Sequence, residues 1–362
     1  VKMPLPELQQ GSTVFFYDEV QECPRALLSL KTALDDKRFD FIASGSYLGV
    51  NGYVVSDDTP KPVGCTDEFD MRTLDFEEFL WGIGISDDMI ASLRTYFIEN
   101  KPVPYAVNKQ MMGYYRLYIA TGGMPEVVQK YIDTKDFREV DRLQRSLLQG
   151  YQYDIAHYAT AEEKVKAEKC YLSLAGQLLD KENHKFQYKE IEHGARAQKY
   201  YSSIEWLIRA DIIHMCRRIT DMRYDLEDYA RDDFFRAYTT DLSLLVAMKD
   251  FFLKQHIVEN TLSGNTKGGL YECAIADALF KNGYTLYFYK NDTTKKEIDF
   301  LIQKEGHVIP IEVKSGNTRA NSLTSVIRNK PDIDCGYKFV DGNIGVDDDG
   351  IITLPLYMAF FI

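Results

Sequence analysis

The sequence has no surplus of positive charge, no paired cysteines and no long apolar run. Lys and Arg number 43 against 55 Asp and Glu, which gives a formal net charge of -12 at pH 7. An acidic chain does not bind nucleic acid through its overall charge, so any DNA contact requires a local basic patch. The 6 cysteines are scattered, without a C-x-x-C pair, which argues against a zinc site and a disulfide framework.

The absence of long apolar runs also bears on location. Residues 353–362 are apolar but have about half the length needed to cross a bilayer. No signal peptide is recognisable. We therefore expect a cytoplasmic protein that makes no membrane contact. Its 362 residues, 45% hydrophobic, are enough for two or three domains with their own cores.

Charged residues lie within two apolar strands near the C-terminus. Residues 297–302 and 308–314 are rich in β-branched and aromatic side chains, and the polar turn between them predicts a hairpin. Because side chains alternate along a strand, Glu312 and Lys314 share one face of the second strand. Asp299, on the first strand, can lie beside them.

Two interpretations of these charges are open. Asp299 and Glu312 offer hard oxygen ligands for a divalent cation, and Lys314 could position or activate a water molecule. Alternatively, Glu312 and Lys314 form a surface ion pair that contributes little to stability. The Glu-x-Lys strand alone does not decide between the two.

The preceding segment adds a third carboxylate. Gly268-Gly269 opens a predicted helix over residues 270–281, and Glu272 falls in its first turn, where a carboxylate suits the helix dipole. A predicted strand over residues 284–289 follows. The order is therefore a helix with Glu, a strand, a strand with Asp and a strand with Glu-x-Lys.

This order resembles the PD-(D/E)xK nuclease superfamily, which has the restriction-endonuclease-like fold. The resemblance covers about the last third of the chain. Ile298 stands where that family often has proline before the Asp, a departure that the family tolerates. The resemblance implies that Lys314 assists catalysis and that three carboxylates hold Mg²⁺: Glu272, Asp299 and Glu312.

The N-terminal region has a second set of polar residues at strand ends. The apolar strand over residues 13–17 ends in Asp18 and Glu19, and a second strand over residues 39–43 is followed by Ser44. In an open α/β sheet such ends face the ligand crevice. A strand end that simply faces solvent is the alternative.

The first strand resembles a Walker B motif, and the second resembles the sensor strand of an AAA-type ATPase. The resemblance implies that Asp18 holds magnesium, that Glu19 orients the attacking water, and that Ser44 or Ser46 is the polar sensor. The phosphate-binding motif G-x-x-x-x-G-K-[ST] does not occur. We therefore expect a truncated ATPase core that does not bind ATP tightly, although the intact family does.

Residues 74–81 and 118–126 resemble a prokaryotic family of AAA-type ATPases that are fused to a C-terminal region of unknown function. Their aromatic stripe and the sequence Gly122-Gly123-x-Pro125 predict packing and helix capping rather than catalysis. Residues 89–158 follow a helical pattern that would form the ATPase lid.

Residues 164–220 predict three helices and a short strand at residues 211–216, which suggests a winged-helix module. Four basic side chains there could contact DNA phosphates: Arg196, Lys199, Arg217 and Arg218. Because acidic residues are interspersed among them, DNA contact and protein contact are equally open.

The predicted fold class is thus a multidomain α/β protein with four parts. Residues 1–85 form a truncated P-loop ATPase remnant and residues 86–160 a helical lid. Residues 161–230 form a winged-helix-like module and residues 231–362 a restriction-endonuclease-like α/β domain.

Two functional hypotheses follow, in addition to ATP hydrolysis, which the missing phosphate loop disfavours. In the first, the C-terminal domain is a Mg²⁺-dependent DNA phosphodiesterase. In the second, the nuclease-like fold is a non-catalytic module that binds nucleic acid or protein. Expected partners are DNA, another protein or a second copy of the chain through its ATPase part.

Overall fold

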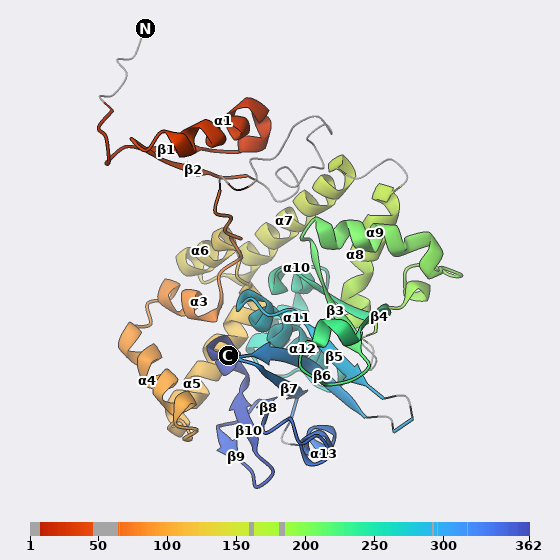
Figure 1. Cartoon of the computed structure of the whole chain (residues 1–362). Coiled ribbons are helices and arrows are strands. Elements are labelled where there is room, and N and C mark those ends of the chain that lie inside the picture. Colours follow the sequence, from red (N-terminus) through yellow and green to blue (C-terminus); the bar gives the residue numbers. More distant parts are fainter. Residues whose placement is uncertain are drawn as a thin grey trace. The chain divides into compact units, whose positions relative to one another are not determined.

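The structure is a computed structural model that describes residues 8–45, 64, 66–158, 163–180, 185–291, 293–294, 296–316 and 318–362. Two compact units divide the chain. Unit 1 holds residues 1–71 and 157–160, and unit 2 holds residues 72–156 and 161–362. Figure 1 labels the elements of both units.

Unit 1 contains two parallel strands, β1 (Val14–Tyr17) and β2 (Asp40–Ala43), joined through helix α1 (Pro24–Asp35). Proline at the start of α1 suits a position whose N–H has no helical partner. Leu27 and Leu30, one turn apart, are buried against the strands. The two predicted strands are confirmed.

Unit 2 begins with helices, as predicted for residues 89–158. Helix α3 starts with a capping box in which the Asp75 and Glu78 side chains accept each other's backbone N–H groups. The helices are α3 (Phe76–Gly82), α4 (Asp87–Ile98), α5 (Tyr105–Thr121), α6 (Pro125–Thr134) and α7 (Phe137–Tyr158).

The middle of unit 2 alternates helices and strands. Its elements are α8 (Glu163–Leu179), α9 (Ala197–Arg209), β3 (Ile213–Ile219), β4 (Ala230–Thr239), α10 (Leu242–Ala247) and α11 (Phe252–Val258). The apolar pattern of residues 242–253 predicts one helix, but the structure has two, because the Asp250 side chain accepts the N–H of Phe252 at 2.9 Å and a new helix begins there.

The C-terminal part supplies most of the sheet. Its elements are α12 (Gly264–Lys281), β5 (Tyr287–Lys290), β6 (Glu297–Lys304), β7 (His307–Lys314), α13 (Asn321–Asn329), β8 (Gly336–Val340), β9 (Gly345–Val346), β10 (Ile351–Pro355) and the 3-10 helix η4 (Leu356–Phe361).

The eight strands of unit 2 form one mixed sheet in the order β4-β3-β5-β6-β7-β8-β10-β9. The predicted β6–β7 hairpin is confirmed, and Glu305 and Gly306 turn it with φ values of 50° and 85°. Strand β3, expected as the wing of a separate module, pairs with β4 and β5 in this same sheet.

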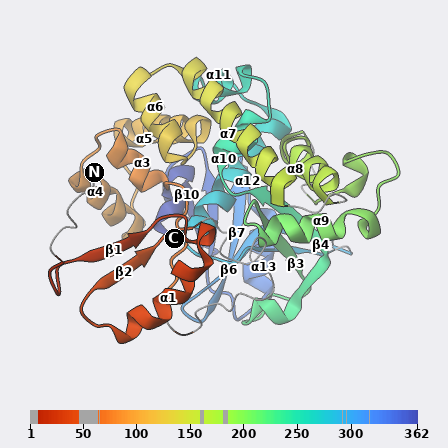
Figure 2. The same ribbon diagram turned by 90° about the horizontal axis from the view of Figure 1, so that it is seen from above.

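Helices cover the sheet and one another. Helix α12 packs on β4 and β7, α8 packs on α9 and α12, and α5 packs on α10 and α11 (Figure 2). No described helix combines the length and the apolar character that crossing a membrane requires. The mixed α/β class is confirmed, while the winged-helix and nuclease-like identities of the smaller parts stay predictions.

Candidate functional site

Helix α12 and strands β6 and β7 carry the four residues predicted for the acidic site. The prediction that Glu272 lies in the first turn of its helix is wrong. Helix α12 begins at Gly264, so Glu272 sits near its middle, where the helix N-terminus does not stabilise it. The residue is only 6% exposed, so its carboxylate needs another source of positive charge.

That charge comes from Arg236 on strand β4. Its Nη1 donates to Oε1 of Glu272 at 2.6 Å, and the hydroxyl of Tyr238 donates to the same oxygen at 2.7 Å. Arg236 and Tyr238 are two residues apart and therefore share one face of β4. The predicted metal ligand Glu272 is thus the partner of a guanidinium and a phenol.

Arg236 is 2% exposed and has further anionic neighbours. Its Nη2 donates to Glu297 of β6, and its Nη1 lies 3.4 Å from the carbonyl oxygen of Asp299. The guanidinium also lies over the ring of Phe288, 4.5 Å from its centre. Burial alone would lower the pKa of Arg236, but the neighbouring acidic groups, Glu272 first and then Tyr238 and Glu297, raise it well above its usual value.

Asp299 lies close to this network. Its Oδ2 accepts the backbone N–H of Val313 at 2.8 Å, which joins β6 to β7. Burial, followed by the negative charge of Glu272, raises the pKa of Asp299 to about 7. The carboxyl group therefore carries a proton part of the time at neutral pH.

Glu312 and Lys314 form the ion pair that the sequence allowed. Nζ of Lys314 lies 2.5 Å from Oε1 of Glu312, and Oε2 of Glu312 accepts the N–H of Leu323 at 3.3 Å. Burial would lower the pKa of Lys314, but Glu312, then Asp299 and Glu272, raise it. The pair is not a surface pair, because Glu312 is only 4% exposed.

The four predicted residues therefore influence one another electrostatically, yet each of the three carboxylates already accepts a hydrogen bond from a protein group. Among the residues described, no three His, Cys, Asp or Glu side chains are grouped so that they could hold a metal ion. As placed, Glu272 faces a cation that belongs to the chain itself. The arrangement does not fit the predicted Mg²⁺ site.

The predicted ATPase residues of unit 1 do come together. The Ser44 hydroxyl donates to Oδ1 of Asp18 at 2.7 Å, at the carboxyl ends of β2 and β1. The N–H of Glu19 donates to the same hydroxyl at 3.3 Å, with Glu19 in a left-handed conformation at φ 49°. Ser46, the alternative sensor, lies outside the described residues.

Two of the basic residues predicted for DNA have internal partners. Arg217 donates from Nη1 to Glu227 at 2.7 Å and lies 3.7 Å from Asp232. Arg218 donates to the carbonyl oxygen of Lys290 at 2.8 Å. These guanidinium groups link β3 to its neighbours in the fold.

The other two basic residues lie at the N-terminal end of α9. Lys199 pairs with Glu192, which also binds Lys169 at 2.8 Å. Arg196 is exposed at the position before the helix. The four side chains thus do not form a basic surface free of acidic partners.

Sequence reasoning missed Arg236 and Tyr238, because residues 234–238 have the apolar pattern of an ordinary strand and match no motif. A signal was present: one arginine stands inside the apolar run Phe-Phe-Arg-Ala-Tyr. A charge in such a run requires a buried partner. Nothing in the sequence identifies that partner as Glu272, which lies 36 positions away.

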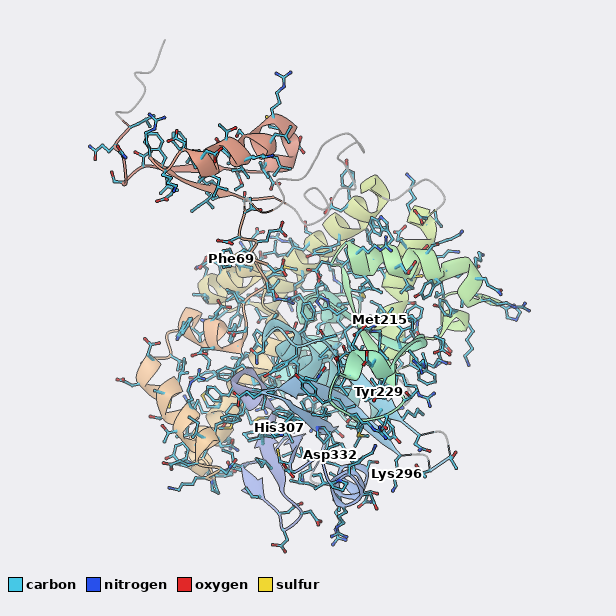
Figure 3. The ribbon with its side chains drawn as sticks, viewed as in Figure 1. Phe69, Met215, Tyr229, Lys296, His307 and Asp332 are labelled. Carbon is cyan, nitrogen blue, oxygen red and sulfur yellow. The ribbon has the colours of Figure 1, made fainter. Side chains whose placement is uncertain are left out.

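Two hollows of unit 2 lie elsewhere. One of about 490 Å³ is lined by Arg72, His214, Phe280 and Met215, the last of which is labelled in Figure 3. The other, of about 350 Å³, lies along α4 and includes Glu77 and Arg94. No residue of the predicted acidic site lines either of these two hollows.

Three protein-family models match parts of the chain. An AAA domain matches residues 2–80, a domain of unknown function (DUF8612) matches residues 112–255, and a domain of unknown function (DUF4143) matches residues 267–358. No curated protein and no solved structure matches the chain. The first match supports an ATPase-family protein, in agreement with the Asp18–Ser44 contact.

Proposed function

We propose that this ATPase-family chain uses the C-terminal part of unit 2 as a non-catalytic module that binds a protein partner. The observation that carries the proposal is the buried Arg236–Glu272 pair. A guanidinium is permanently charged, so it neutralises Glu272 at every accessible pH and competes with any metal ion for the same oxygen. A divalent ion would have to displace it.

The order of elements supports a nuclease-like origin for the module. Helix α12 carries Glu272, and strand β5 follows it. Strand β6 then carries Asp299, and β7 carries Glu312 and Lys314. The acidic residues and lysine are retained, but each is engaged by protein groups. A protein can keep an enzyme's fold without the enzyme's chemistry when it binds its partner through its surface rather than through the former active-site pocket.

A protein partner is favoured over nucleic acid by the pairing of the basic residues. DNA binding depends on lysines and arginines that can neutralise phosphates. Arg217 and Lys199 already face Glu227 and Glu192, and Arg218 binds a backbone carbonyl. The net charge of -12 adds long-range repulsion.

For unit 1, we propose weak nucleotide binding by this chain. The Asp18–Ser44 contact supports the Walker B and sensor assignment, with Asp18 and Glu19 as the residues that would hold magnesium and a water molecule when nucleotide is bound. The phosphate-cradling motif is not in the sequence. Titration of a fluorescent ATP analogue should show no saturation at micromolar concentrations, and tight binding would contradict this.

A second candidate function is Mg²⁺-dependent phosphodiester cleavage. It is favoured by one observation, the half-buried Lys314 beside Glu312 and in the field of Asp299. In that function the carboxylates would hold the ion, which would supply an activated water, and Lys314 would help to orient that water.

One experiment separates the two candidates. Wild type and Lys314→Ala are titrated with Mg²⁺ and Mn²⁺ by calorimetry and assayed for cleavage of single- and double-stranded DNA. The non-catalytic proposal expects no saturable heat at millimolar metal ion and equal, background cleavage by both proteins. Metal binding by the wild type, with cleavage that Lys314→Ala abolishes, would establish the second candidate instead.

A further inference from the structure

The hollow of about 490 Å³ lies where strands β3 and β5 separate. Residues 213–215 of β3 line one side of it, and residues 283–286, which precede β5, line another. The ladder between the two strands begins only at the pair Arg217 and Tyr287. Among the described strands, the first half of β3 therefore pairs with β4 on one side and with none on the other.

The main-chain groups of Met215 face this open side. Along a strand in an antiparallel pair, residues alternate between those that bond across the ladder and those that face away. Arg217 donates its N–H to the carbonyl oxygen of Leu286, on the β5 side, at 3.1 Å. Met215 lies two residues earlier, so its N–H and C=O face the same side, before the ladder with β5 begins. A peptide group placed there could pair with both.

Helix α9 forms one wall of the hollow, which we call the β3 hollow. It packs on β3 and contributes Glu205, Ile208 and Arg209 to the lining. Within the described ranges, neither Glu205 nor Arg209 has an ion-pair or hydrogen-bond partner. These two residues are one helical turn apart, so the wall offers one charge of each sign at neighbouring positions.

The other face of β3 adds an aromatic wall. His214 follows Ile213 and precedes Met215, so its side chain lies on the opposite face of the strand, where it stacks on Phe280 of α12. His214 is 8% exposed, and its Nε2 has no hydrogen-bond partner among the described residues. A buried polar atom without a partner is unfavourable, and a bound peptide group could satisfy it.

We propose that the β3 hollow receives an extended segment of a protein partner, which pairs with Met215 by strand addition. The proposal deepens the proposed function and rests on it. Alternate side chains of an extended segment lie about 6.6 Å apart on one face, close to the roughly 6 Å between residues one helical turn apart. A basic and an acidic residue, two positions apart, would therefore face Glu205 and Arg209, and the apolar residue between them would face Phe280.

The test is calorimetric titration of the full chain with blocked pentapeptides. The probes are acetyl-Gly-Lys-Leu-Glu-Gly-amide and acetyl-Gly-Glu-Leu-Lys-Gly-amide, which present the charges in the two possible directions, and the version of each with Ser in place of Leu. At least one leucine peptide should bind saturably, and its serine version should bind about tenfold more weakly. Failure of both leucine peptides to bind, or equal binding of the serine versions, overturns the proposal.

Met215→Pro removes the main-chain donor that faces the hollow, because the N–H of residue 215 takes no part in the β4 ladder. It should weaken peptide binding about tenfold, the effect of one hydrogen bond. The matched control Met215→Leu keeps the donor and should bind like the wild type. Equal binding by Met215→Pro overturns the proposal.

The Met215 amide gives a second readout should Met215→Pro not fold. In a chain labelled with ¹⁵N-methionine, its resonance is the one that Met215→Leu lacks. Adding the peptide should shift this resonance, and a peptide that binds without shifting it overturns the proposal.

The remaining outcomes separate this inference from the proposed function. Metal-dependent DNA cleavage contradicts the non-catalytic function, whatever the peptides do. No cleavage and no peptide binding overturns only the β3 hollow as a docking site. Self-association in sedimentation experiments that Met215→Pro abolishes would identify a second copy of the chain as the occupant and would overturn the assignment to a different protein.

Discussion

Asp241 accepts the backbone N–H of Gly123 at 3.0 Å, although the two residues are 118 positions apart. Its other carboxylate oxygen accepts the N–H of Ser243 at 2.8 Å and so caps the start of α10. One buried carboxylate therefore fixes both the start of α10 and the turn that separates α5 from α6. The glycine pair serves packing and capping, as the sequence indicated.

The turn leaves no room for a side chain at Gly123. A Cβ atom there would lie 2.0 Å from the carbonyl oxygen of Leu74, which is backbone and cannot swing away. We expect Gly123→Ala to lower the free energy of unfolding by about 3 kcal/mol or more, because overpacking forces the backbone to shift. Urea denaturation followed by tryptophan fluorescence measures it, since both tryptophans, Trp81 and Trp206, lie in unit 2.

Gly113 is the matched control. It lies inside α5, and the nearest atom to a Cβ there is an Arg116 nitrogen at 4.0 Å. Gly113→Ala should raise stability by about 0.5–1 kcal/mol, because alanine is the better helix former. Equal losses for the two substitutions would contradict the steric argument.

Asp299 should make stability depend on pH. Its folded pKa of about 7 lies above the usual value of 3.8, so the folded state holds a proton that the unfolded state has lost over this interval. Stability from this group is therefore full below about pH 4 and falls as pH rises towards 7. Asp299→Asn should flatten that decline, by an amount on the order of a few kcal/mol at most.

The measurement is a series of urea titrations between pH 4 and 8 for wild type and Asp299→Asn. The difference between the two curves isolates the carboxyl group. A difference that does not change with pH would show that Asp299 titrates normally in the folded chain.

His214 should make stability depend on pH in the opposite direction. Burial, followed by the positive charges of Arg72 and Lys281, lowers its pKa to about 3 from 6.5. The unfolded state therefore binds a proton that the folded state refuses, and stability is lost as pH falls from about 6.5 towards 3. The ring stacks on Phe280, so His214→Phe keeps an aromatic contact while removing the titration.

We expect His214→Phe to lose less stability than the wild type between pH 7 and pH 4. Thermal unfolding across this interval measures the difference. Parallel acid profiles for the two proteins would contradict the assigned cause.

Local sequence pattern predicts many of the helices and strands but few of the contacts between residues that are distant in the sequence. The β6–β7 hairpin, α1 between two strands and the helices from residue 89 onward follow from side-chain periodicity and turn residues, which act over a few positions. The predicted start of α12 at residue 270 is too late, because Gly268-Gly269 looks like a helix boundary in the sequence. The helix runs through both glycines, and Gly269 packs directly on the Leu178 backbone.

The candidate site, like the fold, is only partly predictable from local sequence pattern. Asp299, Glu312 and Lys314 lie on one hairpin, so alternation along two adjacent strands was sufficient to bring them together. Arg236 reaches Glu272 only because β4 and α12 pack on each other, and no local rule predicts that contact. Motif spacing therefore does not identify Arg236, the residue whose charge neutralises Glu272.

The pairing of basic residues predicts poor DNA binding. We expect fluorescence anisotropy at 150 mM salt to show only weak binding of DNA. The dissociation constant should lie within the non-specific range of about 10⁻⁴–10⁻⁶ M or above it. Replacing Arg196, Lys199, Arg217 and Arg218 together by alanine should change it less than about threefold, since phosphate contacts would otherwise each weaken binding. A large loss with a reduced salt dependence would restore the DNA-binding hypothesis.

The two acidic partners of Arg236 should differ in their contribution to stability. The Glu272 side chain is 8% exposed, whereas that of Glu297 is 30% exposed and also binds Lys290. Glu272→Gln removes one partner of a buried pair, which costs about 3–5 kcal/mol. Glu297→Gln leaves Arg236 its buried partner and should cost about 1 kcal/mol, in the range of partly screened pairs.

Tyr238→Phe provides the intermediate case, because it removes one hydrogen bond to Glu272 without changing charge and should cost about 1–1.5 kcal/mol. Urea unfolding at pH 7 ranks the three variants. The order Glu272→Gln, Tyr238→Phe, Glu297→Gln identifies Glu272 as the carboxylate that depends on the guanidinium. A larger loss for Glu297→Gln than for Glu272→Gln would mean that Arg236 is held chiefly from the strand side, and that Glu272 is less dependent on it than the geometry indicates.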